Sequence, residues 1–471
     1  MLDVIIVGAG PAGVLAALRA GDLGAKTALV TSGQFGGMAA NDGPVPVRTL
    51  AHAARLLREA RQLGQYGITT GEPILDYSQL LQRVREVTND VRSHSSWRTN
   101  INELGVDVYE NAGSVHFEDA HNVRSSSGLH LQGKNIIICT GGSSRRLDVP
   151  GAELTATHSD AWKLQKVPPS MLVIGGGATG AQVASIFNAF GCRVQLFHSG
   201  PRILPTEDSD VSIAMANAFR NSGIDVKENF GVIESFEKSS SGVRMRFIKE
   251  GEPQSAEASL AVIAVGWIAN TAELNLLQAG VETNHRGFIE VDEFLRTSNS
   301  NIFAAGDVTG RLMLVPQAIH DGFVAGTNAV QGPTMPVPEH FAPIGSFTDP
   351  EYAQVGLTEN KARQSHDVMV DFIRFDQTTR TIIDGRTTGF CKLIVDRATR
   401  NIVGCHVVGE RAVEISQIAA VAMSARMRVD DLARVPLSFP TYAGILGRLA
   451  GKVTRELNLN TEWQGAQSEG L

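Results

Sequence analysis

Two stretches of the chain repeat one pattern of hydrophobic and polar positions. Residues 3–7 form a short apolar run, residues 13–24 carry apolar positions at helical spacing, and residues 27–30 form a second apolar run. The same order recurs within residues 171–197. A buried strand followed by a helix and a second strand is typical of a β-α-β unit. The pattern therefore predicts an α/β protein with two Rossmann-like dinucleotide-binding folds.

The rest of the chain predicts further helices and a different C-terminal domain. Residues 50–63 have one apolar helical face, and residues 79–104 form a polar, helix-like stretch. A Pro-rich segment at 332–338 has the composition of a linker. Apolar runs at 390–395 and 402–408 then precede a segment with helical periodicity. We expect an α+β domain there.

Composition excludes several classes of protein. Of 471 residues, 43% are hydrophobic and 19% are charged, which is globular composition, and the net charge is −7. We therefore expect no nucleic-acid partner. No run of about 18 apolar residues occurs, so we expect no membrane span. No targeting signal is visible at the N-terminus, so we expect a cytoplasmic protein. The four cysteines are too scattered for a disulfide scaffold, and we expect no metal site.

Each β-α-β unit contains a glycine motif between its first strand and its helix. The first motif is Gly8-Ala9-Gly10-Pro11-Ala12-Gly13, and the second is Gly175-Gly176-Gly177-Ala178-Thr179-Gly180. Glycines at this position let the backbone approach a pyrophosphate, which the N-terminus of the helix binds through its amides. Two such sites predict an enzyme that moves a hydride from a nicotinamide to a flavin.

A third element, residues 297–307, ends as an apolar strand followed by Gly306-Asp307. An aspartate there can accept hydrogen bonds from the hydroxyls of a ribityl chain. A strand followed by an ordinary Asp turn gives the same pattern, so this element becomes informative only together with the two glycine motifs.

The ordered set of motifs resembles the class I pyridine nucleotide-disulfide oxidoreductases, which include lipoamide dehydrogenase, glutathione reductase and mercuric reductase. The resemblance spans nearly the whole chain and rests on Gly8 to Gly13, Gly36-Gly37, Thr140-Gly141-Gly142, Gly175 to Gly180, Val265-Gly266, Gly306-Asp307, Phe347 to Pro350 and Val355 to Glu359. It implies an FAD-binding domain in two segments (1–150 and 271–338), an NAD(P)-binding domain (151–270) and an interface domain (339–471) that forms a homodimer.

The resemblance and the motifs together give the expected cofactor-binding residues. For FAD these are Gly8, Gly10, Pro11, Ala12, Gly13, Thr31, Ser32, Gly37, Met38, Gly113, Thr140, Gly141, Gly142, Asp307 and Val315. For the nicotinamide nucleotide they are Gly175, Gly177, Ala178, Thr179, Gly180, His198, Ser199, Arg202, Val232 and Gly266.

The chain departs from the family where thiol chemistry takes place. Where the family has Gly-Gly-Thr-Cys-x-x-x-x-Cys, Ala39 and Pro44 replace the cysteines. The His and Glu of the family's His-Pro-Thr-x-x-Glu motif are replaced by Phe439 and Gly444. The base of that motif serves the thiols, so losing both together is coherent. We expect no redox disulfide beside the flavin.

A charged pair and an acidic position change as well. Arg48 and Gln182 stand where the family has a Lys near flavin N5 and its Glu partner. Arg48 could stabilise an anionic reduced flavin, or it could only pair with surface acids. His198 and Ser199 stand where NAD-specific members carry an acid, with Arg202 close behind, and this favours NADPH over NADH.

We therefore expect an FAD-dependent NAD(P)H oxidoreductase that passes a hydride from NAD(P)H to FAD and then directly to a small, quinone-like acceptor. Two alternatives stay open. One is a flavin- or nucleotide-binding redox sensor without turnover. The other is an FAD-dependent oxidoreductase of one specific metabolite, for which His320 is the nearest candidate base in the sequence, although a histidine on a helix face is the simpler interpretation.

Overall fold

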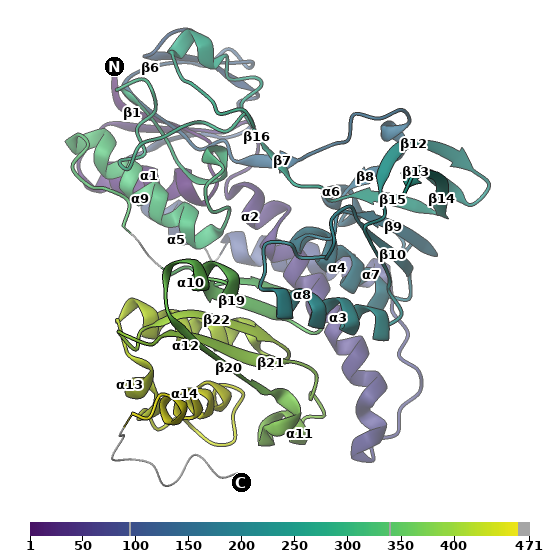
Figure 1. Ribbon diagram of the computed structural model, residues 1–471. Coiled ribbons are helices and arrows are strands. Elements are labelled where there is room, and N and C mark those ends of the chain that lie inside the picture. The colour runs from purple at the N-terminus through teal and green to yellow at the C-terminus, as the bar shows by residue number, and fades with distance from the viewer. Residues whose placement is uncertain (94–95, 339–340, 460–471) are drawn as a thin grey trace.

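The computed structural model describes residues 1–93, 96–338 and 341–459. Figure 1 shows three regions, each built on a β-sheet with helices packed against it. The expected α/β fold with two Rossmann-like units and a C-terminal α+β unit is confirmed. No helix in the described part of the chain is long and apolar enough to cross a membrane.

The first unit is a mostly parallel sheet with helices on it. Its strands are β1 (Leu2–Val7), β2 (Thr27–Val30), β3 (Asp107–Tyr109), β4 (Val115–Phe117), β5 (Asn122–Ser125), β6 (His130–Ile138), β7 (Gly142–Ser144) and β17 (Ile302–Ala304). Helices α1 (Pro11–Asp22), α5 (Ser96–Glu103) and α9 (Val315–Gln331) pack together beside this sheet. Helices α2 (Gly37–Asn41), α3 (Pro44–Gln62) and α4 (Tyr77–Ser93) lead away from it, and residues of α3 and α4 join the core of the second Rossmann-like unit. The strand order is β3-β2-β1-β6-β5-β4, with β17 parallel to β6.

Small residues bring α1 and α9 of the first unit close together. A Cβ added at Gly322 of α9 would lie 2.2 Å from the carbonyl oxygen of Ala12, and one at Gly326 would lie 2.8 Å from that of Ala16. Because these glycines leave no side chain between the helices, α9 lies directly on α1. The chain just before α9 is thereby held beside the first glycine motif.

The second unit repeats the parallel β-α-β arrangement. Its strands are β8 (Ala156–Thr157), β9 (Ser170–Ile174), β10 (Arg193–His198), β11 (Asp225–Glu228), β12 (Val232–Ser239), β13 (Gly242–Lys249), β14 (Glu252–Ala258), β15 (Leu260–Ile263) and β16 (Trp267–Ala269). Its helices are α6 (His158–Ala161), α7 (Ala178–Ala189) and α8 (Ser209–Asn221). The parallel sheet has the order β11-β10-β9-β15-β8, while β12, β13 and β14 form an antiparallel sheet. β16 pairs with β7 and so joins this unit to the first.

The C-terminal unit is an antiparallel sheet of order β18-β19-β22-β21-β20. Its strands are β18 (Ile344–Ser346), β19 (Tyr352–Gly356), β20 (Val368–Arg374), β21 (Phe390–Asp396) and β22 (Ile402–Val408). Its helices are α10 (Glu359–Ser365), α11 (Thr379–Ile383), α12 (Ala412–Ser424), α13 (Val429–Ala433) and α14 (Gly444–Glu456). α12 packs on β19 and β22, and α14 packs on β20 and β21. Both helices present an apolar face to the core of this unit.

Short 3-10 helices complete the described elements, at Leu63–Tyr66, Ala152–Leu154, Leu276–Ala279, Gly306–Thr309 and Phe375–Gln377. The sequence placed the main strands within one or two residues. The helical prediction for 79–104 is confirmed by α4 and α5, whereas α3 begins six residues earlier than the apolar face suggested. Pro44 at the first position of α3 explains that start, because the fixed φ of proline suits a first helical turn.

Candidate cofactor-binding site

The first glycine motif forms a tight turn between β1 and α1. The amide of Gly8 donates a hydrogen bond to the carbonyl oxygen of Val30 at 2.8 Å. Gly8 has φ +112°, and a Cβ added there would lie 2.2 Å from the oxygen of Cys139. A Cβ at Gly13 would lie 1.8 Å from the oxygen of Gly8. Both positions therefore require glycine for backbone and packing reasons.

The second motif reproduces this geometry between β9 and α7. The amide of Gly175 donates to the oxygen of Phe197 at 2.8 Å. Gly175 has φ +111°, and a Cβ there would lie 2.2 Å from the oxygen of Ala264. A Cβ at Gly180 would lie 1.8 Å from the oxygen of Gly175. The two turns are thus near copies of each other, as the repeated sequence pattern indicated.

The middle glycine of each motif borders open space. Gly10 and Gly177 are the N-cap residues of α1 and α7, and a Cβ at either would have no atom of the chain within 4 Å. Their helix amides point toward this space, where a pyrophosphate group fits. Gly37 lies beside the first turn, because its own Cβ would come within 2.6 Å of the Cα of Gly10. The described residues therefore fit a dinucleotide at each turn, with Pro11 and Ala12 in the first turn of α1 and Ala178 and Thr179 in that of α7.

Asp307 is brought to the first turn by the pairing of β17 with β6. Gly306 has φ +76°, and its Cβ would lie 3.0 Å from that of Ala12. Burial raises the pKa of Asp307, and the nearby charge of Asp321 raises it further. Within the described residues no hydrogen-bond donor meets the Asp307 carboxylate. An enclosed carboxylate with free acceptor capacity fits a ribityl hydroxyl. Gly142 lies alongside, with a would-be Cβ 3.9 Å from that of Asp307.

Two of the remaining residues expected at the FAD site lie at the end of β2. Thr31 is buried and donates its amide to Tyr109 at 2.9 Å, while Ser32 is exposed. Gly113 has φ +73°, and a Cβ there would lie 2.0 Å from Oγ of Ser126. The positive φ and the contact with Ser126 therefore explain why residue 113 is a glycine.

Thr140 and Gly141, also expected at this site, lie at the crossing between the two Rossmann-like units. Thr140 donates its hydroxyl to the oxygen of Asn270 at 2.8 Å, and the amide of Asn270 donates to the oxygen of Gly141 at 3.0 Å. Met38 lies in α2 and Val315 begins α9. These contacts fix the two connecting strands, β7 and β16, to each other.

The candidate nucleotide residues of the second unit gather after β10. Nδ1 of His198 accepts a hydrogen bond from the amide of Gly176 at 3.3 Å, and burial lowers the pKa of His198. The imidazole is therefore neutral at neutral pH. Ser199 is exposed, and Nη2 of Arg202 donates to the oxygens of Pro205 and Glu207 at 3.3 and 3.2 Å.

Two further residues expected at the second site are on its open side. Val232 is 72% exposed at the start of β12, and Gly266 has φ +112° with no atom within 4 Å of its would-be Cβ. An acid that sequence analysis did not single out lies opposite His198 in the sheet, namely Glu228. Glu228 accepts from the amide of Ile203 at 2.9 Å and from Arg220 at 2.7 Å, so its charge is compensated within the chain.

The structure directs Arg48 and Gln182 to different partners. Nη1 of Arg48 lies 3.7 Å from Oε1 of Glu351, and its guanidinium lies 4.3 Å from the ring centre of Phe347. Gln182 instead donates its side-chain amide to the oxygen of Ala178 in its own helix at 3.3 Å. Glu351 directly follows a motif noted in the sequence, but no local pattern indicates that it is buried beside α3.

The four cysteines, Cys139, Cys192, Cys391 and Cys405, are buried and form no disulfide. Cys139 lies under the first glycine turn, where burial raises its pKa well above the usual range. Ala39 lies in α2 and Pro44 begins α3. Phe439 is 68% exposed, and Gly444 begins α14. None of these residues is a reactive thiol or a paired acid-base group.

Comparison with protein families gives two matches. Residues 2–322 match the pyridine nucleotide-disulphide oxidoreductase model, and residues 342–450 match the dimerisation domain of the same family. The chain is 32% identical over 451 residues to a dihydrolipoyl dehydrogenase of Zymomonas mobilis, covering 94% of this chain and 95% of that one. It is 30% identical over 433 residues to a mercuric reductase of Staphylococcus aureus, covering 91% and 78%.

A solved structure shows the same fold. The HOCl-induced flavoprotein disulfide reductase RclA from Escherichia coli aligns with a TM-score of 0.83 at 26% identity, covering 95% of this chain and 99% of that one. The similarity therefore extends across all three units.

Proposed function

The chain belongs to the pyridine nucleotide-disulphide oxidoreductase family, and from this membership we propose that it is an NAD(P)H-dependent flavoprotein oxidoreductase that reduces a small, quinone-like acceptor without a redox disulfide. Members of the family use FAD and NAD(P)H. The chemistry that FAD supplies when bound is transfer of a hydride equivalent between the nucleotide and the acceptor.

One observation carries the disulfide-free part of the proposal. Every cysteine of the chain is buried and unpaired, while Ala39 and Pro44 occupy the two positions of the family's cysteine motif. An alanine has no nucleophile, and the buried thiols cannot reach a substrate disulfide as thiolates. The exposed Phe439 supplies no proton donor. A substrate disulfide therefore has no thiol to exchange with, whereas a planar acceptor needs only access to the flavin.

The chain's own residues would hold the two nucleotides at the two glycine turns. Gly10 and Gly177 leave the first amides of α1 and α7 open to a pyrophosphate. Asp307 would accept hydrogen bonds from the ribityl hydroxyls. Arg48 would place a permanent positive charge near the flavin ring and so stabilise negative charge there. Its present partner is Glu351 rather than Gln182.

We favour NADPH as the nucleotide. The end of β10 carries His198 and Ser199 in place of an acid, and the nearby Glu228 is already paired with Arg220. No uncompensated carboxylate of these residues would repel a 2′-phosphate, and Arg202 is within the same loop to bind it.

We propose residues 1–150 with 271–338 as the FAD domain, 151–270 as the NAD(P) domain and 339–471 as the interface domain. Residues 94–95, 339–340 and 460–471 lie outside the described chain.

We also propose a homodimer, built through the matched dimerisation domain. Several large apolar side chains of the C-terminal unit are more than half exposed, among them Phe372, Ile382, Ile383 and Phe439. A subunit interface that covered these side chains would remove their apolar surface from water.

The experiment is an acceptor screen on the purified, FAD-loaded protein under anaerobic conditions. NADPH and NADH are each paired with a benzoquinone, lipoamide and glutathione disulfide, and flavin reoxidation is followed by absorbance. The proposal predicts reoxidation by the quinone and none by either disulfide. Turnover of a disulfide in the absence of added thiol would contradict it. A flavin that NADPH and NADH both fail to bleach would favour the redox-sensor alternative.

A further inference from the structure

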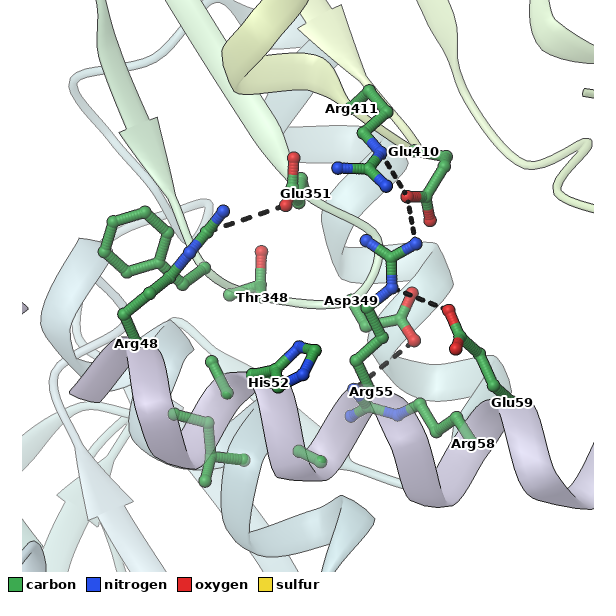
Figure 2. Close-up of a pocket in the computed structure, with 14 residues that line it drawn as sticks. Arg48, His52, Arg55, Arg58, Glu59, Thr348, Asp349, Glu351, Glu410 and Arg411 are labelled. Carbon is green, nitrogen blue, oxygen red and sulfur yellow. Dashed lines mark hydrogen bonds and ion pairs between the residues drawn. The ribbon is translucent and has the colours of Figure 1, made fainter. Parts of the chain in front are cut away.

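A cavity of about 300 Å³ lies where α3 meets the C-terminal unit. Figure 2 shows its walls: α3 on one side, the segment between β18 and β19 on another, and Glu410 with Arg411 between β22 and α12 on a third. This volume is enough for a small organic molecule. None of the residues that line this cavity belongs to either glycine motif.

Most acids on the cavity wall are already neutralised by arginines. Asp349 pairs with Arg58 at 3.3 Å, and Glu410 pairs with Arg55 at 2.7 Å. Arg386 lies behind both acids, at 3.7 Å from Asp349 and 3.8 Å from Glu410. These carboxylates therefore have little capacity left to attract a cation.

Three cationic or cation-forming side chains in the wall keep free donors. Arg48 is 45% exposed, and its 3.7 Å ion pair with Glu351 is too long for a hydrogen bond. Arg411 is 49% exposed, and its ion-pair contact is with its chain neighbour Glu410 at 3.4 Å. Within the described residues His52 makes no hydrogen bond or ion pair, and Figure 2 shows its ring standing in the cavity. The hydrogen-bonding groups of the cavity wall that remain free are therefore mainly donors, and two of the three side chains that carry them are positively charged.

Among the acids of the cavity wall, Glu351 has the weakest contacts to stabilise its negative charge. Its side chain is 14% exposed, and its buried Oε2 has no hydrogen-bond partner. Burial, together with the charges of Glu414 and Glu410, raises the pKa of Glu351 to about 7, and Arg48 opposes the shift. At neutral pH a large share of Glu351 is therefore protonated and can itself donate a hydrogen bond. An ionisable group shifted in this way inside a cleft is typical of a functional site.

We propose that this cavity binds a small oxyanion, a carboxylate or phosphate, held by Arg48, His52 and Arg411. Guanidinium groups match the planar geometry of carboxylate and phosphate oxygens, so two of them on opposite sides of the cavity favour an anion over a neutral molecule. The site shares Arg48 with the proposed flavin site, but anion binding is measured without turnover, so this proposal holds or fails whatever the acceptor is.

The arrangement makes binding depend on pH. Charged and titratable groups surround Glu351 from three elements. They are Arg48, His52 and Arg55 from α3, Glu410 and Arg411 from the turn between β22 and α12, and Glu414 from α12. An anion in the cavity favours the protonated carboxyl of Glu351. Binding therefore takes up protons and is tighter at low pH.

The test is isothermal titration calorimetry of the FAD-loaded protein with succinate and with inorganic phosphate, at about pH 6 and about pH 8, where linkage predicts an affinity change of about tenfold. Neutral succinamide is the control for shape. Comparing succinate with phosphate tells whether carboxylate or phosphate is the better ligand. Two results would overturn the proposal: no binding of either anion at the lower pH, or equally good binding of succinamide.

Substitutions in the cavity wall test whether the anion binds in this cavity. Arg411→Gln should weaken succinate binding about tenfold, the value of one charge-assisted contact, and Arg411→Lys should restore part of it. Arg61→Gln is the control, since Arg61 lies on α3 with Arg48 and His52 but pairs with Glu72 outside the cavity. Glu351→Gln should keep binding and flatten its pH dependence. Equal losses in the Arg61 and Arg411 variants would mean attraction to general surface charge and would contradict the site.

Discussion

Lys392 and Asp208 form a buried ion pair, with Nζ 3.0 Å from Oδ1 and each side chain 1% exposed. Nζ of Lys392 also lies 2.6 Å from carboxylate oxygens of Asp210 and Glu359. Burial disfavours the charged lysine, but hydrogen bonds to the three carboxylates outweigh it and raise its pKa. Since Lys392 is in β21 and Asp208 caps α8, the pair fastens the second Rossmann-like unit to the C-terminal unit.

Removing this lysine should be costly. Lys392→Met leaves Asp208 buried without its partner, and we expect a loss of about 3 to 5 kcal/mol in the free energy of unfolding. Lys134→Met is the control, because Lys134 is 62% exposed in its pair with Asp3 and should change stability by about 1 kcal/mol or less. Denaturant unfolding of both variants measures the difference. Equal effects would show that the buried pair does not fasten the two units.

Substitution of Gly10 and substitution of Gly177 should each impair the binding of a different nucleotide. Gly10→Ala adds a Cβ that meets no atom of the chain, so stability should change by less than about 1 kcal/mol. The methyl group would occupy the approach of a pyrophosphate, so FAD occupancy should fall about tenfold or more. Gly177→Ala should leave FAD content unchanged and raise KM for NADPH instead. Flavin absorbance per protein and steady-state kinetics measure both. The prediction is contradicted if either variant impairs both cofactors equally.

Stability should depend on the protonation of Glu207. Burial raises its pKa from 4.5 to about 7, so the folded state holds a proton that the unfolded state has released between these values. The contribution of Glu207 to the free energy of unfolding is therefore fully present below about pH 4.5. It falls by about 3 kcal/mol as the pH rises through 7.

Glu207→Gln isolates that contribution. The amide resembles the protonated acid, so the variant should match the wild type near pH 4.5 and exceed its stability by roughly 2 to 3 kcal/mol near pH 8. Urea unfolding at the two pH values gives the comparison. A stability difference that stays constant with pH would show that Glu207 titrates normally.

Nucleotide preference should depend on Arg202. If this side chain binds a 2′-phosphate, Arg202→Gln should raise KM for NADPH about tenfold, the usual value of one charge-assisted contact, and leave KM for NADH nearly unchanged. Arg246→Gln is a suitable control in the same unit, since Arg246 pairs with Glu237 on the antiparallel sheet of β12 and β13. Similar increases for both nucleotides would mean that Arg202 only supports the loop through Pro205 and Glu207.

The sequence predicted what depends on local pattern. Both β-α-β units follow from hydrophobic periodicity, and both glycine turns follow from motifs whose geometry is fixed within a few residues. The pairs that join distant units could not be predicted. Lys392 and Asp208 are 184 residues apart, and neither lies in a distinctive motif. Their meeting depends on the packing of one unit against another, for which a single sequence carries no local signal.

Arg48 shows the same limit within the candidate site. The sequence singled it out by its place in a motif, and the loss of its expected partner at Gln182 was also visible. Its contact with Glu351 was not, because the burial of Glu351 comes from the fold of the C-terminal unit around α3. The structure therefore gives Arg48 an acidic partner in the C-terminal unit, where the sequence left it without one.

The central claim, a flavin that works without a redox disulfide, is tested most directly by anaerobic titration of the FAD-loaded protein with NADPH. A flavin alone accepts two electrons, so one equivalent of NADPH per FAD should bleach it fully, no new thiols should appear, and a quinone should restore the absorbance. Consumption of two equivalents per FAD, with thiols detectable afterwards, would contradict the account.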